Sequence, residues 1–233
     1  MGFEGFPFVV GWELTLACNL RCRHCASSAG RPRERELTLD EALGLCGQLP
    51  ALAVQEVDFT GGEPLVREDW WRIAERLREL QITTRMVTNG LLLTPGTVER
   101  MKAVGLATVA VSIDGVEEVH DRIRASPGLF RRVLAGMARL ADAGIRLSAI
   151  TAVSAVNLPT LPALLSLLES VGVDTWQLQP ILPQGRTLSS PELALSDEEY
   201  VRIARFVRDA RHETRHGRMK VVPADSLGYF TEL

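Results

Sequence analysis

The sequence has few cysteines, no basic excess and no long apolar run, and each of these absences excludes a class of protein. Its 233 residues include only 4 cysteines, whereas a secreted disulfide framework would have a larger, paired set. The formal net charge is -3, whereas a nucleic-acid-binding protein would have an excess of basic residues. No run is long enough to cross a bilayer, and the N-terminus lacks the basic and apolar regions of a signal peptide. We therefore expect a cytoplasmic protein with neither nucleic acid nor membrane as a partner.

The remaining composition is that of an ordinary globular protein. Hydrophobic residues make up 46% of the chain and charged residues 24%, which is enough for one sizeable core. No change in composition marks a boundary between domains. Residues 1–233 are therefore expected to form a single domain.

Short apolar segments alternate along the chain with capped amphipathic segments. The apolar segments predict strands at residues 8–17, 54–59, 83–87, 107–112, 146–153 and 175–178. Helices are predicted to begin at Thr38, Thr94, Ser126, Asn157 and Ser196, and a further helix is predicted at about residues 70–80. Thr38 and Ser196 each have a glutamate at the capping-box spacing. This alternation predicts an α/β fold with a parallel sheet, either an open doubly wound sheet or a curved partial barrel.

Residues with chemical character gather where the predicted strands end. In either parallel architecture, ligands bind at the carboxyl ends of the strands. The residues at these ends are Cys18, Cys22 and Cys25 after the first strand, Gly61, Gly62, Glu63 and Pro64 after the second, Asn89 after the third, Ser112 and Asp114 near the fourth, and Gln179 after the sixth. We therefore expect these loops to converge on one site.

Three of the cysteines lie on one short loop. Cys18, Cys22 and Cys25 are four and three residues apart, and three thiolates can hold three irons of a cubane cluster. A fourth iron would then be open to a small ligand. The alternative is a zinc site completed by His24 or Cys46, but the adjacent His24 and Cys25 would have difficulty in binding one tetrahedral ion. Cys46 itself lies in the apolar stripe of a predicted helix, which favours a buried hydrophobic role.

The cysteine spacing after the first strand, together with Gly61-Gly62-Glu63-Pro64 after the second, resembles the two signatures of radical S-adenosylmethionine (SAM) enzymes. The resemblance extends from about Trp12 to about Arg186. It implies a partial (β/α)6 TIM-like barrel over about residues 8–212, with residues 213–233 as a candidate start of a C-terminal extension.

The resemblance also implies cofactors and residue roles. Cys18, Cys22 and Cys25 would hold a [4Fe-4S] cluster, and the amino and carboxylate groups of SAM would chelate the open iron. The implied SAM contacts are the backbone of Gly61, Gly62, Glu63 and Pro64 near the amino group, Ser112 and Arg124 at the ribose and carboxylate, Asn89, Asp114 and Gln179 at the ribose or methionine, and His24 beside the adenine. The chain departs from the family pattern after Arg124, where Ala125 replaces a frequent glycine.

Several of these residues also have a simpler interpretation. Asn89-Gly90 and Asp114-Gly115 are ordinary turn sequences, and Ser112 is compatible with a plain strand end. Arg122 and Arg124 fit a solvated surface, as charged runs usually do. His120 is predicted to be structural rather than catalytic.

The resemblance implies an enzyme that cleaves SAM reductively to a 5'-deoxyadenosyl radical, which abstracts hydrogen from a substrate. Residues 11–30 and 178–186 resemble the SPASM-containing branch, many members of which modify ribosomally made peptides. A peptide substrate is therefore the leading hypothesis. The alternatives are biosynthesis of a small-molecule cofactor such as a tetrapyrrole or quinone, or a non-catalytic zinc or iron–sulfur module. An enzyme of this kind needs an electron donor such as flavodoxin or ferredoxin.

Overall fold

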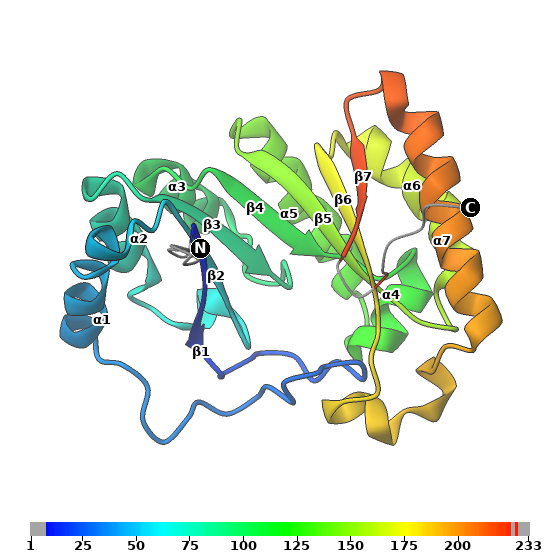
Figure 1. Cartoon of the computed structure of the whole chain (residues 1–233), viewed down its shortest axis with the longest axis horizontal. Helices are drawn as coiled ribbons and strands as arrows, with labels where there is room; N and C mark the ends of the chain where they lie inside the picture. The colour runs from blue at the N-terminus through cyan, green and yellow to red at the C-terminus, as the bar shows by residue number, and fades with distance from the viewer. Residues whose placement is uncertain (1–7, 225–226, 228–233) are drawn as a thin grey trace, which may run out of the picture.

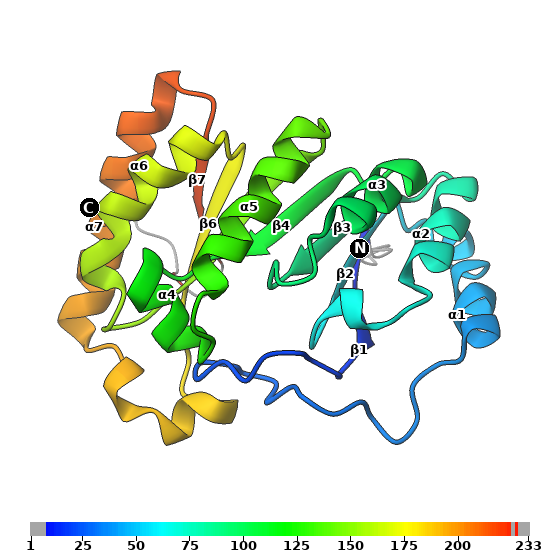
Figure 2. The ribbon, with the colours of Figure 1, turned by 180° about the vertical axis from the view of Figure 1, so that it is seen from behind.

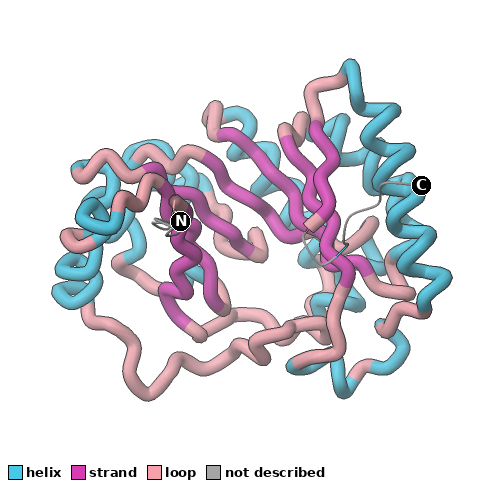
Figure 3. The backbone as a smooth tube through the Cα atoms, in the orientation of Figure 1, coloured by secondary structure: helices cyan, strands magenta, loops and turns pink. Residues whose placement is uncertain are grey.

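The computed structural model describes residues 8–224 and 227 of the chain. Within these residues, parallel strands form one sheet whose spatial order follows the sequence. The strands are β1 (Val9–Thr15), β2 (Glu56–Gly61), β3 (Thr83–Thr88), β4 (Thr108–Ser112), β5 (Arg146–Val153), β6 (Thr175–Pro180) and β7 (Lys220–Pro223). The sheet curves into a partial barrel (Figures 1 and 3). The barrel does not close, because β1 and β7 remain as the two edges of the sheet.

The helices are α1 (Leu39–Cys46), α2 (Trp70–Glu79), α3 (Pro95–Val104), α4 (Glu117–Arg124), α5 (Leu129–Asp142), α6 (Leu161–Val171) and α7 (Asp197–Glu213). Helices α2, α3, α5 and α6 lie on the convex side of the sheet and in front of the strands in Figure 2, whereas α1 and α7 flank its two ends. None of the helices that the structure describes has the length and apolar character needed to cross a membrane.

Side chains alternate between the two faces of the sheet, and this alternation places the core and the site on opposite sides. In β5, for example, Leu147 and Ala149 are buried, while the intervening Ser148 is partly exposed. The buried set packs beneath the helices. The largest of these side chains is Trp176, whose indole N–H donates to Thr151 Oγ1 at 2.9 Å. The other face carries mainly polar side chains, such as Asp58, Ser148 and Gln177, which line an open cavity and do not fill it like the interior of a closed barrel.

The expected α/β partial barrel is confirmed, as are the six predicted strands. Both capping boxes are present, at Thr38 with Glu41 and at Ser196 with Glu199. Thr94 also caps α3, accepting a hydrogen bond from the backbone N–H of Thr97 at 3.2 Å.

Two predicted helix starts are wrong, and one helix was missed. Asn157 does not cap α6; its amide nitrogen donates instead to the carbonyl oxygens of Asp114 at 2.8 Å and Ala152 at 2.9 Å. α5 begins at Leu129 after Gly128 rather than at Ser126. α4 occupies a polar stretch for which no helix was predicted, because its apolar positions are too few to give a clear period.

The sheet also continues beyond residue 212. β7 pairs in parallel with β6 and so adds a strand to the sheet within residues 213–233. Residues 225–226 and 228–233 lie outside the described part of the chain, and an extension there remains a prediction.

Candidate cofactor site

A cavity of about 340 Å³ opens at the carboxyl ends of β2 to β6. Parallel strands bring their carboxyl ends to the same edge of the sheet, so the loops that follow them meet there. The predicted site residues that line this cavity are Cys18, Cys22, His24, Cys25, Gly61, Gly62, Asn89, Ser112, Arg124 and Gln179. Glu63, Pro64 and Asp114 do not line it.

The three cysteines lie on a loop that leaves β1 and returns toward it, which we call the cysteine loop (residues 18–30). Its two ends are joined because Cys18 N–H donates to Gly30 O at 3.2 Å, and Gly30 N–H donates to Leu16 O at 3.0 Å. All three thiols are free of disulfide bonds. In the described part of the chain, no three His, Cys, Asp or Glu side chains converge on a point that a single metal ion could occupy.

Two of the thiols have hydrogen-bond donors aimed at them. Asn89 Nδ2 lies 3.9 Å from Cys18 Sγ, and an Arg124 guanidinium nitrogen lies 3.9 Å from Cys22 Sγ. Burial raises the pKa of both thiols, while the Arg124 charge acts to lower the pKa of Cys22. Hydrogen bonds to cluster sulfurs are among the features that tune iron–sulfur centres. Three thiols sharing one cavity, two of them with nearby donors, therefore fit a bound cluster.

Two glycines at the end of β2, Gly61 and Gly62, are required by packing against the end of the first strand rather than by the cavity. A Cβ atom on Gly61 would lie 2.2 Å from Thr15 O, and one on Gly62 would lie 2.2 Å from Ala17 O. Gly61 also has a φ of 133°, which strains other residues. Both glycines line the cavity, but it is the close approach to the end of β1 that excludes a side chain.

Glu63 supports the cavity from behind. Its carboxylate accepts hydrogen bonds from Thr88 Oγ1 at 2.8 Å and from the backbone N–H of Asn89 at 2.7 Å. The carboxyl group is fully buried, and burial raises its pKa. Pro64 starts the short helix η2 (Pro64–Val66) and is also buried. In this structure Glu63 thus fixes the loop that presents Asn89, and it offers no surface to a ligand.

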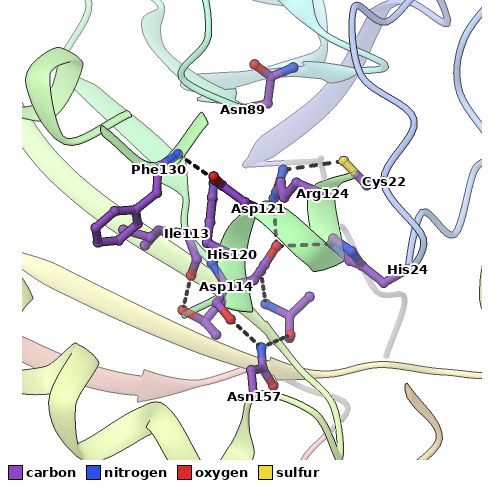
Figure 4. Close-up of polar contacts among 12 residues, drawn as sticks. Cys22, His24, Asn89, Ile113, Asp114, His120, Asp121, Arg124, Phe130 and Asn157 are labelled. Carbon is purple, nitrogen blue, oxygen red and sulfur yellow. Dashed lines mark hydrogen bonds and ion pairs between the residues drawn. The ribbon is translucent and has the colours of Figure 1, made fainter. Parts of the chain in front are cut away.

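Asp114 anchors a second buried network, shown in Figure 4. Its Oδ2 atom accepts from Arg124 Nε at 2.6 Å, and Oδ1 accepts from Ala152 N–H at 2.9 Å. The Arg124 charge lowers the pKa of Asp114 to about 2 against the opposing effect of burial, and Asp114 raises the pKa of Arg124. Asp114 is 0% exposed, and it orients the Arg124 guanidinium toward Cys22.

The two histidines near this network differ in their access to the cavity. His24 lines the cavity with its Nε2 3.5 Å from Asp114 Oδ2, and burial lowers its pKa. His120 is 0% exposed and accepts the backbone N–H of Asp114 on Nδ1 at 3.1 Å. Its position agrees with the structural role predicted for it. The interpretation of Arg124 as solvated surface is wrong, because only 6% of that residue is exposed.

Sequence reasoning missed two residues at this site. Arg186 lines the cavity and hydrogen-bonds to the cysteine loop. Asn19 accepts from Asn89 Nδ2 at 2.7 Å and so orients the amide that faces Cys18. The signal available for Arg186 was its place shortly after a strand end, whereas nothing in the sequence distinguishes Asn19.

The arrangement is a cavity with three thiols at its wall, glycine backbone beside them and a buried guanidinium close to one sulfur. The model of the Radical SAM superfamily matches residues 12–168, a span that includes the cysteine loop, Gly61, Gly62 and Arg124. The chain belongs to the radical SAM superfamily. Members of this superfamily are enzymes that use a [4Fe-4S] cluster and SAM, and the cavity described above has the donors for both.

Two curated relatives illustrate the range of the family. An AdoMet-dependent heme synthase of Nitratidesulfovibrio vulgaris is 33% identical over 208 residues, covering 88% of this chain and 57% of that protein. The mycofactocin maturase MftC of Mycolicibacterium smegmatis is 34% identical over 139 residues, covering 59% of this chain and 35% of that protein. The chain thus spans little more than half the length of the heme synthase.

The fold is shared with a solved structure of another protein. Streptococcus suis SuiB bound to S-adenosylmethionine superposes with a TM-score of 0.81 at 17% identity, covering 94% of this chain and 51% of that one. At this identity the likeness concerns the fold, which is the same partial barrel.

Proposed function

We propose that this chain is the catalytic core of a radical SAM enzyme in which Cys18, Cys22 and Cys25 hold a [4Fe-4S] cluster. The observation that carries the proposal is that these three thiols share one cavity with Gly61, Gly62 and the side chains that follow β3, β4 and β6. When bound, the cluster supplies an electron that cleaves SAM, and the resulting 5'-deoxyadenosyl radical abstracts hydrogen from a substrate.

The residues of the chain bind and orient SAM in this proposal. The cavity-lining backbone of Gly61 and Gly62 lies beside the amino group, and Asn89, Ser112 and Gln179 contact the ribose or methionine. Arg124 faces the carboxylate, since a guanidinium and a carboxylate form a strong charge-assisted pair. His24 lies beside the adenine. Glu63 and Asp114 support this set by holding Asn89 and Arg124 in place.

Two substrate classes remain, and different observations favour them. The resemblance of residues 11–30 and 178–186 to the SPASM branch favours a ribosomally made peptide, as does similarity to a protein named as a maturase. The alignment to a heme synthase spans 88% of the chain against 59% for that maturase, which favours a tetrapyrrole. We regard the tetrapyrrole as the stronger candidate because the longer alignment includes β6 and the loop after it.

The first test is anaerobic purification followed by iron analysis and incubation with SAM and a reductant, with flavodoxin or ferredoxin as donor. We expect about four irons per chain and release of methionine and 5'-deoxyadenosine. A colourless protein that binds zinc and leaves SAM intact would overturn the proposal.

The second test separates the two substrate classes. Reduced enzyme is incubated in parallel with iron tetrapyrroles that carry propionate side chains and with a precursor peptide encoded beside the gene. A mass change in the tetrapyrrole alone supports the cofactor-biosynthesis candidate, and a change in the peptide alone supports the maturase candidate.

A further inference from the structure

The cysteine loop crosses the open side of the barrel, from the end of β1 toward β6 and α4 (Figure 3). Near β1 it is held by the paired backbone of Ala17 and Gly30. Its far side is held by contacts with α4 and with the segment after β6. Those contacts come from Ile123, whose carbonyl accepts Arg23 N–H at 2.9 Å, and from the segment after β6.

Arg186 provides three hydrogen bonds from that segment. Its backbone N–H donates to Cys25 O at 3.0 Å. Its side chain donates from Nε to Cys22 O and from Nη1 to Ala29 O, both at 2.8 Å. The rigid fork of a guanidinium suits it to bind two acceptors at once. One residue therefore fixes the loop at two of the proposed cluster ligands and again near its end.

The residue before Arg186 makes this close approach feasible. Gly185 opens the short helix η4 (Gly185–Ser189) with a φ of 58°. A Cβ atom at this position would lie 2.2 Å from Ala26 O and 2.4 Å from Cys25 O. Both oxygens belong to the backbone of the cysteine loop, so a side chain at residue 185 would push η4 away from the loop.

We propose that Arg186 is a positioning residue, which holds the cysteine loop in its cluster-binding conformation before a cluster is present. All three of its hydrogen bonds go to backbone oxygens and none to sulfur, so they do not depend on a bound metal. A loop ordered in advance loses less conformational entropy when it ligates. The identity of the ligand as a cluster rests on the proposed function, whereas the ordering of the cysteine loop by Arg186 does not.

The test is hydrogen exchange of the full chain, purified anaerobically and measured before and after reconstitution with iron and sulfide. In iron-free Arg186→Met, we expect loop amides such as those of Cys25 and Ser28 to exchange about tenfold faster than in wild type. Exchange in β4 should not change, which shows that the barrel remains folded. Iron should also be lost to a chelator about tenfold faster from the reconstituted variant.

Arg139→Met is the matched control. Arg139 also donates a guanidinium hydrogen bond to a backbone oxygen, that of Leu93 at 3.1 Å, but it contacts no part of the cysteine loop. We expect wild-type exchange of the loop in this variant. Arg186→Lys retains the positive charge but loses the forked guanidinium group. The exchange rate of its cysteine-loop amides should fall between those of wild type and Arg186→Met.

The outcomes separate this proposal from the proposed function. Loop exchange in Arg186→Met within twofold of wild type would overturn the positioning role, as would an Arg186→Lys variant that matches wild type in both measurements. Wild-type protein that binds no iron after reconstitution would overturn the proposed function instead.

Discussion

The ion pair between Asp114 and Arg124 is the most exacting test of the site's architecture, because Arg124 lines the cavity and Asp114 holds it there from a fully buried position. The perturbation is Asp114→Asn, which keeps the shape of the side chain and removes its charge. The Arg124 guanidinium, 6% exposed and 2.6 Å from Asp114 Oδ2, would then lack a charged partner. The amide oxygen of the asparagine can still accept the hydrogen bond from Ala152 N–H, so the substitution mainly removes the ion pair with Arg124.

The magnitude follows from two estimates. The pKa of Asp114 falls from 3.8 to about 2 in the folded protein. At about 1.4 kcal/mol for each tenfold change in ionisation constant, this corresponds to about 2.5 kcal/mol of preference for the charged form. Breaking a buried pair by removing one partner typically costs about 3–5 kcal/mol. We therefore expect Asp114→Asn to lower the free energy of unfolding by about 2–5 kcal/mol.

The assay is urea unfolding of iron-free protein at neutral pH, followed by circular dichroism. Asp114→Asn combined with Arg124→Met should be more stable than Asp114→Asn alone, because the unpaired charge is gone. Glu117→Gln is the control, since Glu117 pairs with Arg131 where both side chains are more than half exposed, and it should cost less than about 1 kcal/mol. A cost for Asp114→Asn no greater than that of the control, or a double variant no more stable than the single one, would refute the reasoning.

Three further predictions concern other parts of the site. Cys22→Ala should abolish iron binding and SAM cleavage, while Cys46→Ala, at a buried helical position, should leave both intact; iron analysis of each variant decides this. Gly62→Ala should lower the free energy of unfolding by about 1–3 kcal/mol, whereas Gly44→Ala, where a Cβ meets no atom within 4 Å, should not destabilise. Burial and the nearby Arg124 charge lower the pKa of His120 from 6.5 to about 4, against the opposing carboxylates of Asp114 and Asp121. As the pH falls, His120 is therefore protonated in the unfolded chain before it is protonated in the folded one, and the free energy of unfolding should decrease by about 3 kcal/mol between pH 6.5 and 4. His120→Asn should reduce this pH dependence, which is measured by unfolding the protein across the same range.

The sequence predicted most of the fold because its signals were local. β-branched and apolar runs specify strands, and capping residues specify helix starts, as at Thr38 and Ser196. The order of these elements leads to a parallel sheet, and a parallel sheet brings the loops after its strands to one edge. That is why the sequence alone predicts one site for Cys18, Asn89 and Gln179, which lie far apart along the chain.

The same local signals misled where a residue serves a distant partner. Asn157 has the features of a helix cap, but its amide group is used by the carbonyl oxygens of Asp114 and Ala152. Arg124 lies in a charged run typical of a surface, yet the carboxylate of Asp114 holds it in the interior. Spacing along the chain does not reveal such pairings, because they depend on which elements pack together.

What the sequence alone determined is the order of strands and helices, the three-cysteine loop and the rim on which the candidate ligands gather. Only the tertiary structure decided which of those ligands face the cavity and which support it, as with Asn89 in front of Glu63 and Arg124 in front of Asp114. It also decided that Arg186 reaches the cysteine loop, 164 residues from Cys22 along the chain. The physical reason is that burial and hydrogen-bond partners follow from the packing of distant segments, whereas propensity and capping act within a few residues.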